Sequence, residues 1–170
     1  QSSIGNYNVA VGTHALYRNA TRNNLVAVGD SALFNNGMNA LDITQAIGNT
    51  ALGSKALYSN TTGSENTAVG YQALFGSTVG SKNTGVGYQA LHSNTLGEEN
   101  TAVGYQAMMS NFTGLYNTAT GFKALQNNAE GSRNTATGYF ALQTNHSGVD
   151  DTANGYQALQ STIDGESNVA

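Results

Sequence analysis

Three histidines and two pairs of adjacent carboxylates are the side chains of this chain best suited to chemistry. His14, His92 and His146 carry the imidazole groups that bind metals or transfer protons. Glu98–Glu99 and Asp150–Asp151 are carboxylate pairs of the type that can act as acid and base. Neighbouring residues of an extended chain face opposite ways, so neither pair is predicted to act as a dyad.

Other chemical motifs are equally weak. Asp150, Asp151 and Asp164 could offer oxygen atoms to calcium, but they lack a calcium-loop signature. The glycine-rich stretch 97–104 is not followed by a phosphate-loop lysine, and the chain has no cysteine. We therefore predict no catalytic residue, no metal site and no cofactor, and we do not expect an enzyme.

A repeat of seventeen residues explains the spacing of most side chains. The recurring glycines are Gly12, Gly29, Gly53, Gly70, Gly87, Gly104, Gly121, Gly138 and Gly155. The unit reads N-T-A-V-G-Y-Q-A-L-x-S-N-T-x-G-S-x, and nine full units cover residues 8–167. A fixed short period predicts one structural unit stacked many times. Residues 1–170 therefore form a single repeat array, and neither end resembles a polar cap, so we expect a segment of a longer fibre protein.

Small and aromatic residues recur at fixed positions of the unit. Gly70, Gly87 and Gly104 stand for the fifth position and Ala73 and Ala90 for the eighth, both of which are the same residue in all nine units. Such residues suit close backbone approach or a positive φ. The sixth position carries aromatic rings that are predicted to stack, including those of three tyrosines. These are Tyr71, Tyr88 and Tyr105.

Polar residues also form columns. Asn at the first position is predicted to form amide ladders between coils, and Gly at the fifteenth is predicted to be left-handed. The fourth position changes from Val to Thr120, Thr137 and Asn154 toward the C-terminal end. We expect this position to lie inside and these three residues to form a polar interior. Four Asn-x-Ser/Thr sequons fall at the twelfth position, and the repeat explains them without glycosylation. They begin at Asn19, Asn60, Asn111 and Asn145.

Composition narrows the class of protein. Charged residues make up 9% of the chain and the net charge is −4, without a basic patch, so nucleic-acid binding is not expected. No apolar run is long enough for membrane insertion. A thin coil buries little, so we expect several chains to share one core.

The local pattern predicts a mainly β fold. Thr-Ala-Val-Gly reads as a short strand in every unit, whereas Tyr-Gln-Ala-Leu fits either a further strand with tight turns or a short helical turn. We prefer a β-solenoid, or β-roll, of 17-residue coils. Nine coils at about 4.8 Å would give a rod on the order of 45 Å.

The repeat is interrupted once, by seven extra residues between Gly29 and Gly53 that we place at about 40–48. Insertions in solenoids form loops on one face, often a binding face. The alternatives are a protruding apolar loop and a bulge packed on the shaft, and removal is expected to leave folding intact. The residues predicted to contact a receptor are Leu41, Asp42, Ile43, Thr44 and Gln45.

The stretch Asn66–Leu74 (N-T-A-V-G-Y-Q-A-L) resembles repeats of phage tail fibres and contractile-injection fibres. It resembles more loosely the N-S-x-A-I-G repeats of YadA-type trimeric autotransporter adhesin heads. The likeness covers the chain and is strongest from Asn49 to Gly165. It implies a homotrimeric, extracellular or virion-surface fibre that gives reach and attaches to a host glycan or protein receptor. The alternative is a ligand- or ice-binding β-solenoid that uses its Thr and Asn arrays.

Overall fold

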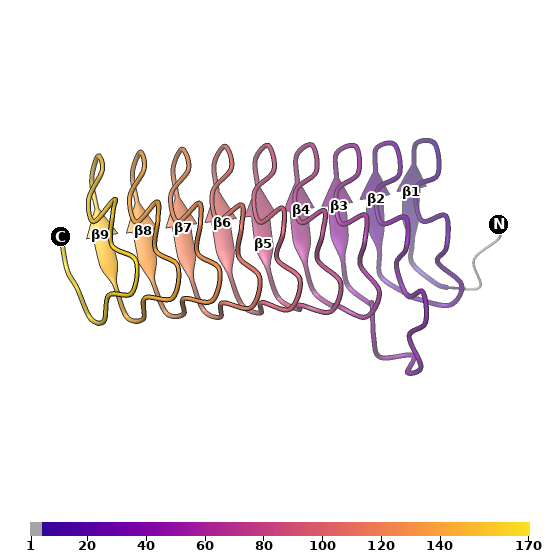
Figure 1. The fold of residues 1–170 in the computed structure, drawn as a ribbon. Helices are drawn as coiled ribbons and strands as arrows, with labels where there is room; N and C mark the ends of the chain where they lie inside the picture. Colours follow the sequence, from indigo (N-terminus) through magenta and orange to yellow (C-terminus); the bar gives the residue numbers. More distant parts are fainter. Residues whose placement is uncertain (1–4) are drawn as a thin grey trace.

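The computed structural model describes residues 5–170 and consists of nine short parallel strands, one in each coil (Figure 1). The strands are β1 (Val9–Val11), β2 (Val26–Val28), β3 (Thr50–Leu52), β4 (Thr67–Val69), β5 (Thr84–Val86), β6 (Thr101–Val103), β7 (Thr118–Thr120), β8 (Thr135–Thr137) and β9 (Thr152–Asn154). They form one sheet in sequence order. The predicted β-solenoid is confirmed.

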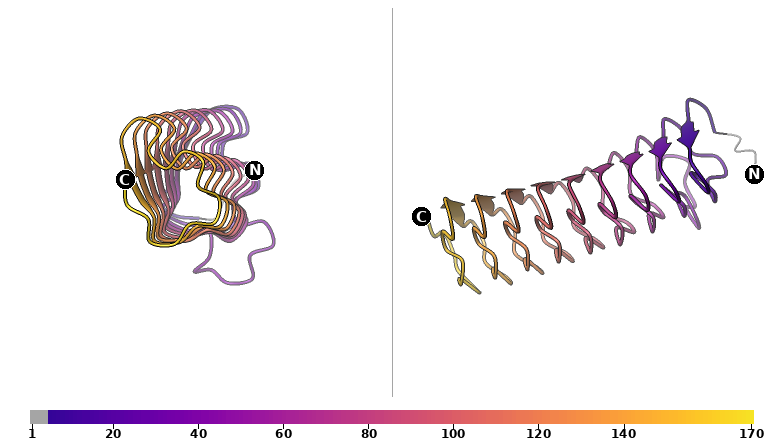
Figure 2. Two further views of the ribbon diagram at one scale, coloured as in Figure 1. Left: turned by 60° about the vertical axis from the view of Figure 1, so that its left-hand side comes forward. Right: turned by 90° about the horizontal axis from the view of Figure 1, so that it is seen from above.

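Equivalent residues of successive coils lie beside one another. In the pairing of β4 with β5, Thr67 is opposite Thr84 and Val69 is opposite Val86, and the same register holds along the sheet. Turned toward the C-terminal end, the coils follow one another with the same outline, and seen from above the stack is gently curved (Figure 2). Among the described residues no helix is found, so none could cross a membrane.

The Tyr-Gln-Ala-Leu segment forms tight turns, so both alternatives, a further strand and a helical turn, are wrong. Gln72 and Leu74 have φ values of +54° and +52°, which interrupt any right-handed helix. The left-handed residues aim successive N–H groups at opposite neighbours. Gln72 N donates to Ser54 O of the previous coil and Leu74 N to Ala90 O of the next, each at 3.0 Å. Hydrogen bonds between coils thus override helix propensity.

The fifth-position glycines are confirmed as close-approach positions with positive φ. Gly70 has φ +131°, and a Cβ added there would overlap the carbonyl oxygen of Gly87. The fifteenth-position glycines are different, because Gly63 and Gly80 do not have positive φ. The prediction of a left-handed fifteenth position is therefore wrong for these glycines. Glycine is needed there because a Cβ would overlap the next coil, as a Cβ on Gly63 would overlap the carbonyl oxygen of Gly80.

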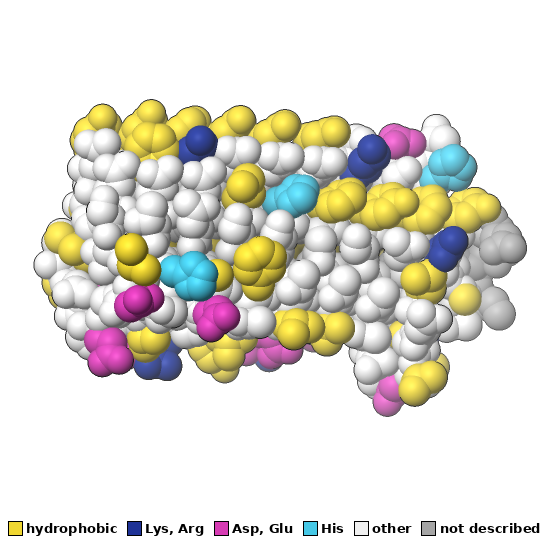
Figure 3. Space-filling view, viewed as in Figure 1, with side chains coloured by type: hydrophobic (Ala, Val, Ile, Leu, Met, Phe, Trp, Pro, Cys, Tyr) yellow, Lys and Arg dark blue, Asp and Glu magenta, His cyan; other side chains and the backbone are white. Residues whose placement is uncertain are grey.

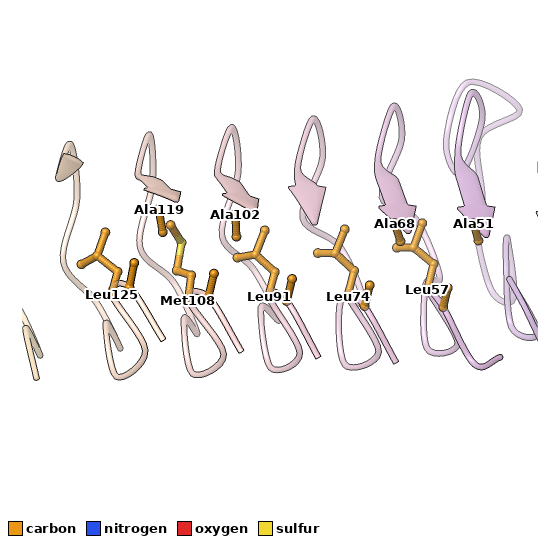
Figure 4. Packing of buried hydrophobic residues seen from close by; sticks show 14 of the residues in the cluster. Ala51, Leu57, Ala68, Leu74, Leu91, Ala102, Met108, Ala119 and Leu125 are labelled. Atoms are coloured by element: carbon orange, nitrogen blue, oxygen red, sulfur yellow. The ribbon is translucent and has the colours of Figure 1, made fainter. Parts of the chain in front are cut away.

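The hydrophobic core is a narrow column inside each chain (Figure 4). The middle residue of each strand is alanine, as at Ala68, except for Gly85 in β5. Ala68 faces the ninth-position leucine column, where Leu74 is fully buried. The eighth-position Ala73 and Ala90 are also fully buried, as a packing role predicts. One chain thus encloses its own core, so sharing a core between chains is not required for burial.

The fourth position lies on the outside, so the predicted polar interior is wrong. Thr120, Thr137 and Asn154 are exposed at the ends of β7, β8 and β9. In a strand of three residues the alternation of side chains places the central alanine inside and its two neighbours outside. The change from Val to Thr and Asn is therefore a change in the outer surface.

Two buried asparagine ladders fill the polar side of the interior. At the first position, Asn66 Nδ2 donates to Asn49 Oδ1 of the previous coil at 3.2 Å and to Gly80 O of its own coil at 2.9 Å. The predicted first-position ladder is confirmed. A second ladder runs along the twelfth position, where Asn111 Nδ2 donates to Asn94 Oδ1 at 2.6 Å. Buried amides are thereby paired along the axis.

Each ladder has a defect. Asp151 replaces Asn at the first position, and its buried Oδ2 has no hydrogen-bond partner among the described residues. Ser77 replaces Asn at the twelfth position. The Ser77 hydroxyl and the facing Asn60 Oδ1 are both buried without a hydrogen-bond partner in the described chain. The serine is too short to bridge Asn60 and Asn94.

The substitution Ser77→Asn is expected to stabilise the protein by roughly 1–2 kcal/mol, because it satisfies Asn60 Oδ1 and offers an acceptor to Asn94. Thermal unfolding followed by circular dichroism measures the change. Ser59→Asn is the control, since it adds the same side chain outside the ladder at a position where Asn35 stands one coil earlier. Equal midpoints for the two variants would contradict the role assigned to the ladder.

Candidate functional site: columns and one loop on the outside of the stack

The residues with chemical potential do not come together. No group of three or more His, Asp or Glu residues placed to hold a metal occurs within residues 5–170. Asp150 is exposed and Asp151 is fully buried, so this pair faces opposite ways as predicted. Glu98 and Glu99 are both exposed, and Glu99 pairs with Lys82.

Within residues 5–170, two ion pairs join successive coils. Arg133 Nε lies 2.7 Å from Asp150 Oδ1, and Lys82 Nζ lies 3.3 Å from Glu99 Oε1. The hydrogen bond from Arg133 lowers the pKa of Asp150 below its ordinary value. The hydrogen bond to Glu99 raises the pKa of Lys82. Both pairs are solvent-exposed, so they contribute little to stability and do not indicate a site.

The sequons lie in the interior. Asn60, Asn111 and Asn145 are fully buried, and their amide groups donate hydrogen bonds within the twelfth-position ladder. A glycosyl group cannot be attached to these nitrogens without opening the stack. The interpretation of the sequons as part of the repeat is therefore supported.

The insertion is a protruding loop, as one of the two alternatives predicts, but its boundaries differ from those expected. Asn36 Nδ2 donates to Ala46 O at 2.9 Å, which is the bond that Asn60 makes with Gly63 in the next coil. The loop therefore spans residues 37–45, and Ala46 rather than Asn39 takes the fifteenth position. We call residues 37–45 the lateral loop; it projects from one side of the stack in Figure 1 and in the left view of Figure 2.

The lateral loop has an apolar tip on an ordered turn. Leu41 is fully exposed and Ile43 is 74% exposed. Between them Asp42 Oδ1 accepts hydrogen bonds from Thr44 N at 2.8 Å and Thr44 Oγ1 at 2.9 Å. These bonds, led by that from the Thr44 backbone, lower the pKa of Asp42. The predicted contact residues thus stand together, clear of the shaft.

Arg22 fastens the lateral loop to the first coil. It replaces the fifteenth-position glycine and is buried, and its Nη2 donates to Ala40 O at 2.8 Å. A Cβ on Gly37 would meet the Arg22 side chain at 2.8 Å, so the loop backbone passes directly over it. The sequence marks Arg22 as a departure from the repeat, but its pairing with the insertion is visible only in the structure.

Two stacks of aromatic rings run along the stack axis (Figure 3). The sixth-position stack is confirmed: Tyr88 and Tyr105 have ring centroids 5.1 Å apart and planes 7° apart. A second stack occupies the tenth position in the first five coils. Its members are Tyr17, Phe34, Tyr58, Phe75 and His92. The sequence shows the change from aromatic to Gln along this position, but it did not indicate that the rings stack.

A glutamine ladder, missed in the sequence, runs beside these rings. It starts at the seventh position, where Gln89 Nε2 donates to Gln72 Oε1 at 2.9 Å, and crosses to the tenth position, where Gln143 Nε2 donates to Gln126 Oε1 at 3.0 Å. The crossing bond joins Gln126 to Gln106 at 3.4 Å.

The outer face of the sheet carries two parallel rows without charge. The second position contributes Thr67 and its equivalents, and the fourth contributes Val69 and its equivalents. Val11, Leu52 and Val103 are among the exposed apolar side chains of the second row. The side chains of this face are thus in register. The face is apolar toward the first coils and more polar toward the last.

His92 makes the tenth-position stack sensitive to acid. Burial lowers the pKa of His92 below 6.5, so the unfolded chain binds the proton more readily and protonation opposes folding. Stability from this group is complete above pH 6.5 and is lost as the pH falls below it.

We expect the melting temperature of the native protein to fall more between pH 7.5 and 5 than that of His92→Phe, whose ring matches Phe75 in the same stack. Parallel pH profiles would contradict this, since the carboxylates titrate equally in both.

No family model, no curated protein and no solved structure matches this chain, so its fold and its outer surfaces carry the functional argument.

Proposed function

We propose that this chain is a structural segment of an attachment fibre, the shaft or adhesive head of a tail fibre or surface adhesin at the virion surface or outside the cell. The observation that carries the proposal is the continuous in-register sheet β1–β9. Each added coil lengthens such a stack without changing its cross-section, so the repeat number sets the reach. The binding surfaces are then columns along the side and the lateral loop.

Association into a parallel homotrimer is part of this proposal. The two outer rows of the sheet contain no charged residue, and Val11, Leu52 and Val103 expose apolar surface there. Burial of such a face between copies removes apolar area from water. Because the apolar end of the face lies toward β1, a parallel arrangement sets apolar against apolar, whereas an antiparallel one sets Val11 against Asn154.

Light scattering after size-exclusion chromatography tests the trimer, with an expected mass of three chains. Substitution of Leu52 and Val103 by Asp is expected to shift the mass toward one chain, because it places charges in the interface. The matched control is Val79→Asp, which changes an exposed valine on another side of the coil. A monomeric native protein would contradict the trimer.

The lateral loop is proposed as the contact with a receptor. Its apolar tip at Leu41 and Ile43 is exposed, and the Asp42–Thr44 turn between them is ordered by hydrogen bonds. A loop ordered before binding loses little conformational entropy on contact. It is also the one place in the described chain where the regular side of the stack is interrupted.

Replacement of residues 37–45 by Thr-Thr, with Arg22→Gly and Ala46→Gly, is expected to leave the fold intact and to lower adsorption of the labelled protein to bacterial cells about tenfold or more. The two threonines are those of the next coil, Thr61 and Thr62, and both glycines restore the repeat. Flow cytometry over a panel of bacterial surfaces measures adsorption, and circular dichroism measures folding.

Leu41→Ser with Ile43→Ser is the matched variant that keeps the loop backbone and removes its apolar tip. Loss of adsorption in both variants supports contact through the tip. Undiminished adsorption of both to every surface that binds the native protein would rule out the loop as the contact.

A ligand- or ice-binding solenoid is the second candidate. It is favoured by the outward direction of both the Thr67 row and the Val69 row, which together form a regular two-row array. The fourth position is Thr only in β7 and β8, and the stack is curved, which fits a flat crystal face less well (Figure 2). Thermal hysteresis of the native protein would favour this candidate over the fibre.

A further inference from the structure

A row of free tyrosine hydroxyls lines one edge of the stack. Tyr71, Tyr88, Tyr105, Tyr139 and Tyr156 are exposed, from 42% at Tyr88 to 72% at Tyr156. Their rings are stacked, whereas their hydroxyl groups make no hydrogen bond to any described residue. This is the row along the upper edge of the molecule in Figure 3. In coils four to nine it presents one phenol per coil, except at Phe122.

Stacking fixes the direction of these hydroxyls and also limits how a ligand can bind. Neighbouring planes such as those of Phe122 and Tyr139 differ by 7°, with centroids 4.9 Å apart. The ring faces are therefore covered by one another, and only edges and hydroxyls are available. A ligand is met by hydrogen bonding to an ordered row rather than by stacking on a ring.

The glutamine ladder supplies a second polar row next to the first. Gln72, Gln89 and Gln106 directly follow the tyrosines of their coils, and each ladder bond uses one N–H of the donor. The second N–H of each donor amide and a remaining lone pair of each acceptor oxygen are left for a ligand. We call the sixth-position rings and the glutamine ladder together the tyrosine–glutamine strip.

The strip has almost no charge. At the sixth and seventh positions of coils four to nine, Lys123 is the one Lys or Arg residue. Its Nζ lies 5.6 Å from the centroid of the Phe122 ring. A polyanion or polycation would find no matching row of counter-charges. The chemistry that fits is a neutral polymer rich in hydroxyl groups, whose units repeat at about the coil spacing of ~4.8 Å.

We propose that the tyrosine–glutamine strip binds a linear, uncharged polysaccharide laid along the stack axis. The proposal deepens the attachment function and rests on it. Each coil makes one or two weak hydrogen bonds to a sugar unit, and the register of the coils lets many act together on one chain. The pre-ordered rows lower the entropy lost on binding. Specificity for a neutral glycan follows from the missing charges.

Affinity electrophoresis in gels that contain hydroxyethyl cellulose, galactomannan or xylan tests the proposal, with heparin as the charged comparison. The native protein is expected to be retarded by at least one neutral polymer and not by heparin. Tyr71→Phe, Tyr88→Phe and Tyr105→Phe together are expected to weaken that retardation about tenfold or more, through three lost hydrogen-bonding groups. The fold tolerates the change, because Phe122 stacks on Tyr105 at 5.1 Å in the same column.

Two matched variants sharpen the result. Tyr17→Phe with Tyr58→Phe removes hydroxyls from the tenth-position stack and is expected to change nothing. Phe122→Tyr fills the gap in the row and is expected to strengthen retardation. Retardation by heparin alone, by no neutral polymer, or equally in native and triple-variant protein overturns the proposal.

The outcomes also separate this proposal from the fibre function. If the triple variant loses chains from the assembly, the strip is an interface between copies and the glycan proposal fails. A trimer that attaches through the lateral loop but ignores every neutral polymer leaves the fibre function standing and removes the strip as its glycan site. A monomer that still binds a neutral polymer through the strip supports the site and removes the fibre.

Discussion

Hydrogen bonding between equivalent groups of successive coils is the constraint on which this structure depends. A strand of three residues has no stability alone, and its backbone N–H and C=O groups are paired by the neighbouring coils. Because strand pairing sets residues one repeat apart opposite each other, as Thr67 is opposite Thr84, equivalent side chains of successive coils lie beside one another. Asparagine and glutamine amides and aromatic rings then form ladders and stacks, and two separate ion pairs of the described residues join successive coils. Side chains of the same kind therefore form columns along the surface of the molecule.

The same constraint explains the unusual backbone. Gln72, Leu74 and Lys82 represent three positions per coil where ordinary residues adopt positive φ. A left-handed residue costs about 1–2 kcal/mol, so such a chain would not choose this conformation as an isolated coil. In the stack, these residues direct N–H groups alternately to the coil before and the coil after. The cost is offset by bonds that exist only when neighbours are present, which makes folding of the array cooperative.

Function on such a scaffold depends on what interrupts or accompanies the regular columns. The lateral loop is fixed by Arg22, a buried cation that takes the place of a glycine. Its guanidinium group donates a hydrogen bond to the carbonyl oxygen of Ala40. The tyrosine row and the glutamine ladder are repeated polar groups, and some of their hydrogen-bond donors and acceptors have no partner within the described chain. Both are lateral features, and neither is a pocket. That arrangement suits contact with an extended surface or polymer better than it suits chemistry on a small molecule.

The seventeen-residue period by itself determined the stacked β architecture, the parallel register, the Asn66 ladder, the Tyr71 stack and the close approach at Gly70, because strict repetition forces equivalent residues into equivalent environments. Tertiary structure alone decided what those environments are. The inward turn of Ala119 sends Thr120 to the surface, and bonds between coils override the helix propensity of Gln72–Leu74. Glycine is required at the fifteenth position because a Cβ would overlap the carbonyl group of the next coil, and not because φ is positive there. The direction of a side chain, the sign of φ and the overlap of an added Cβ all depend on contacts with the neighbouring coil. The sequence of one repeat unit does not specify those contacts.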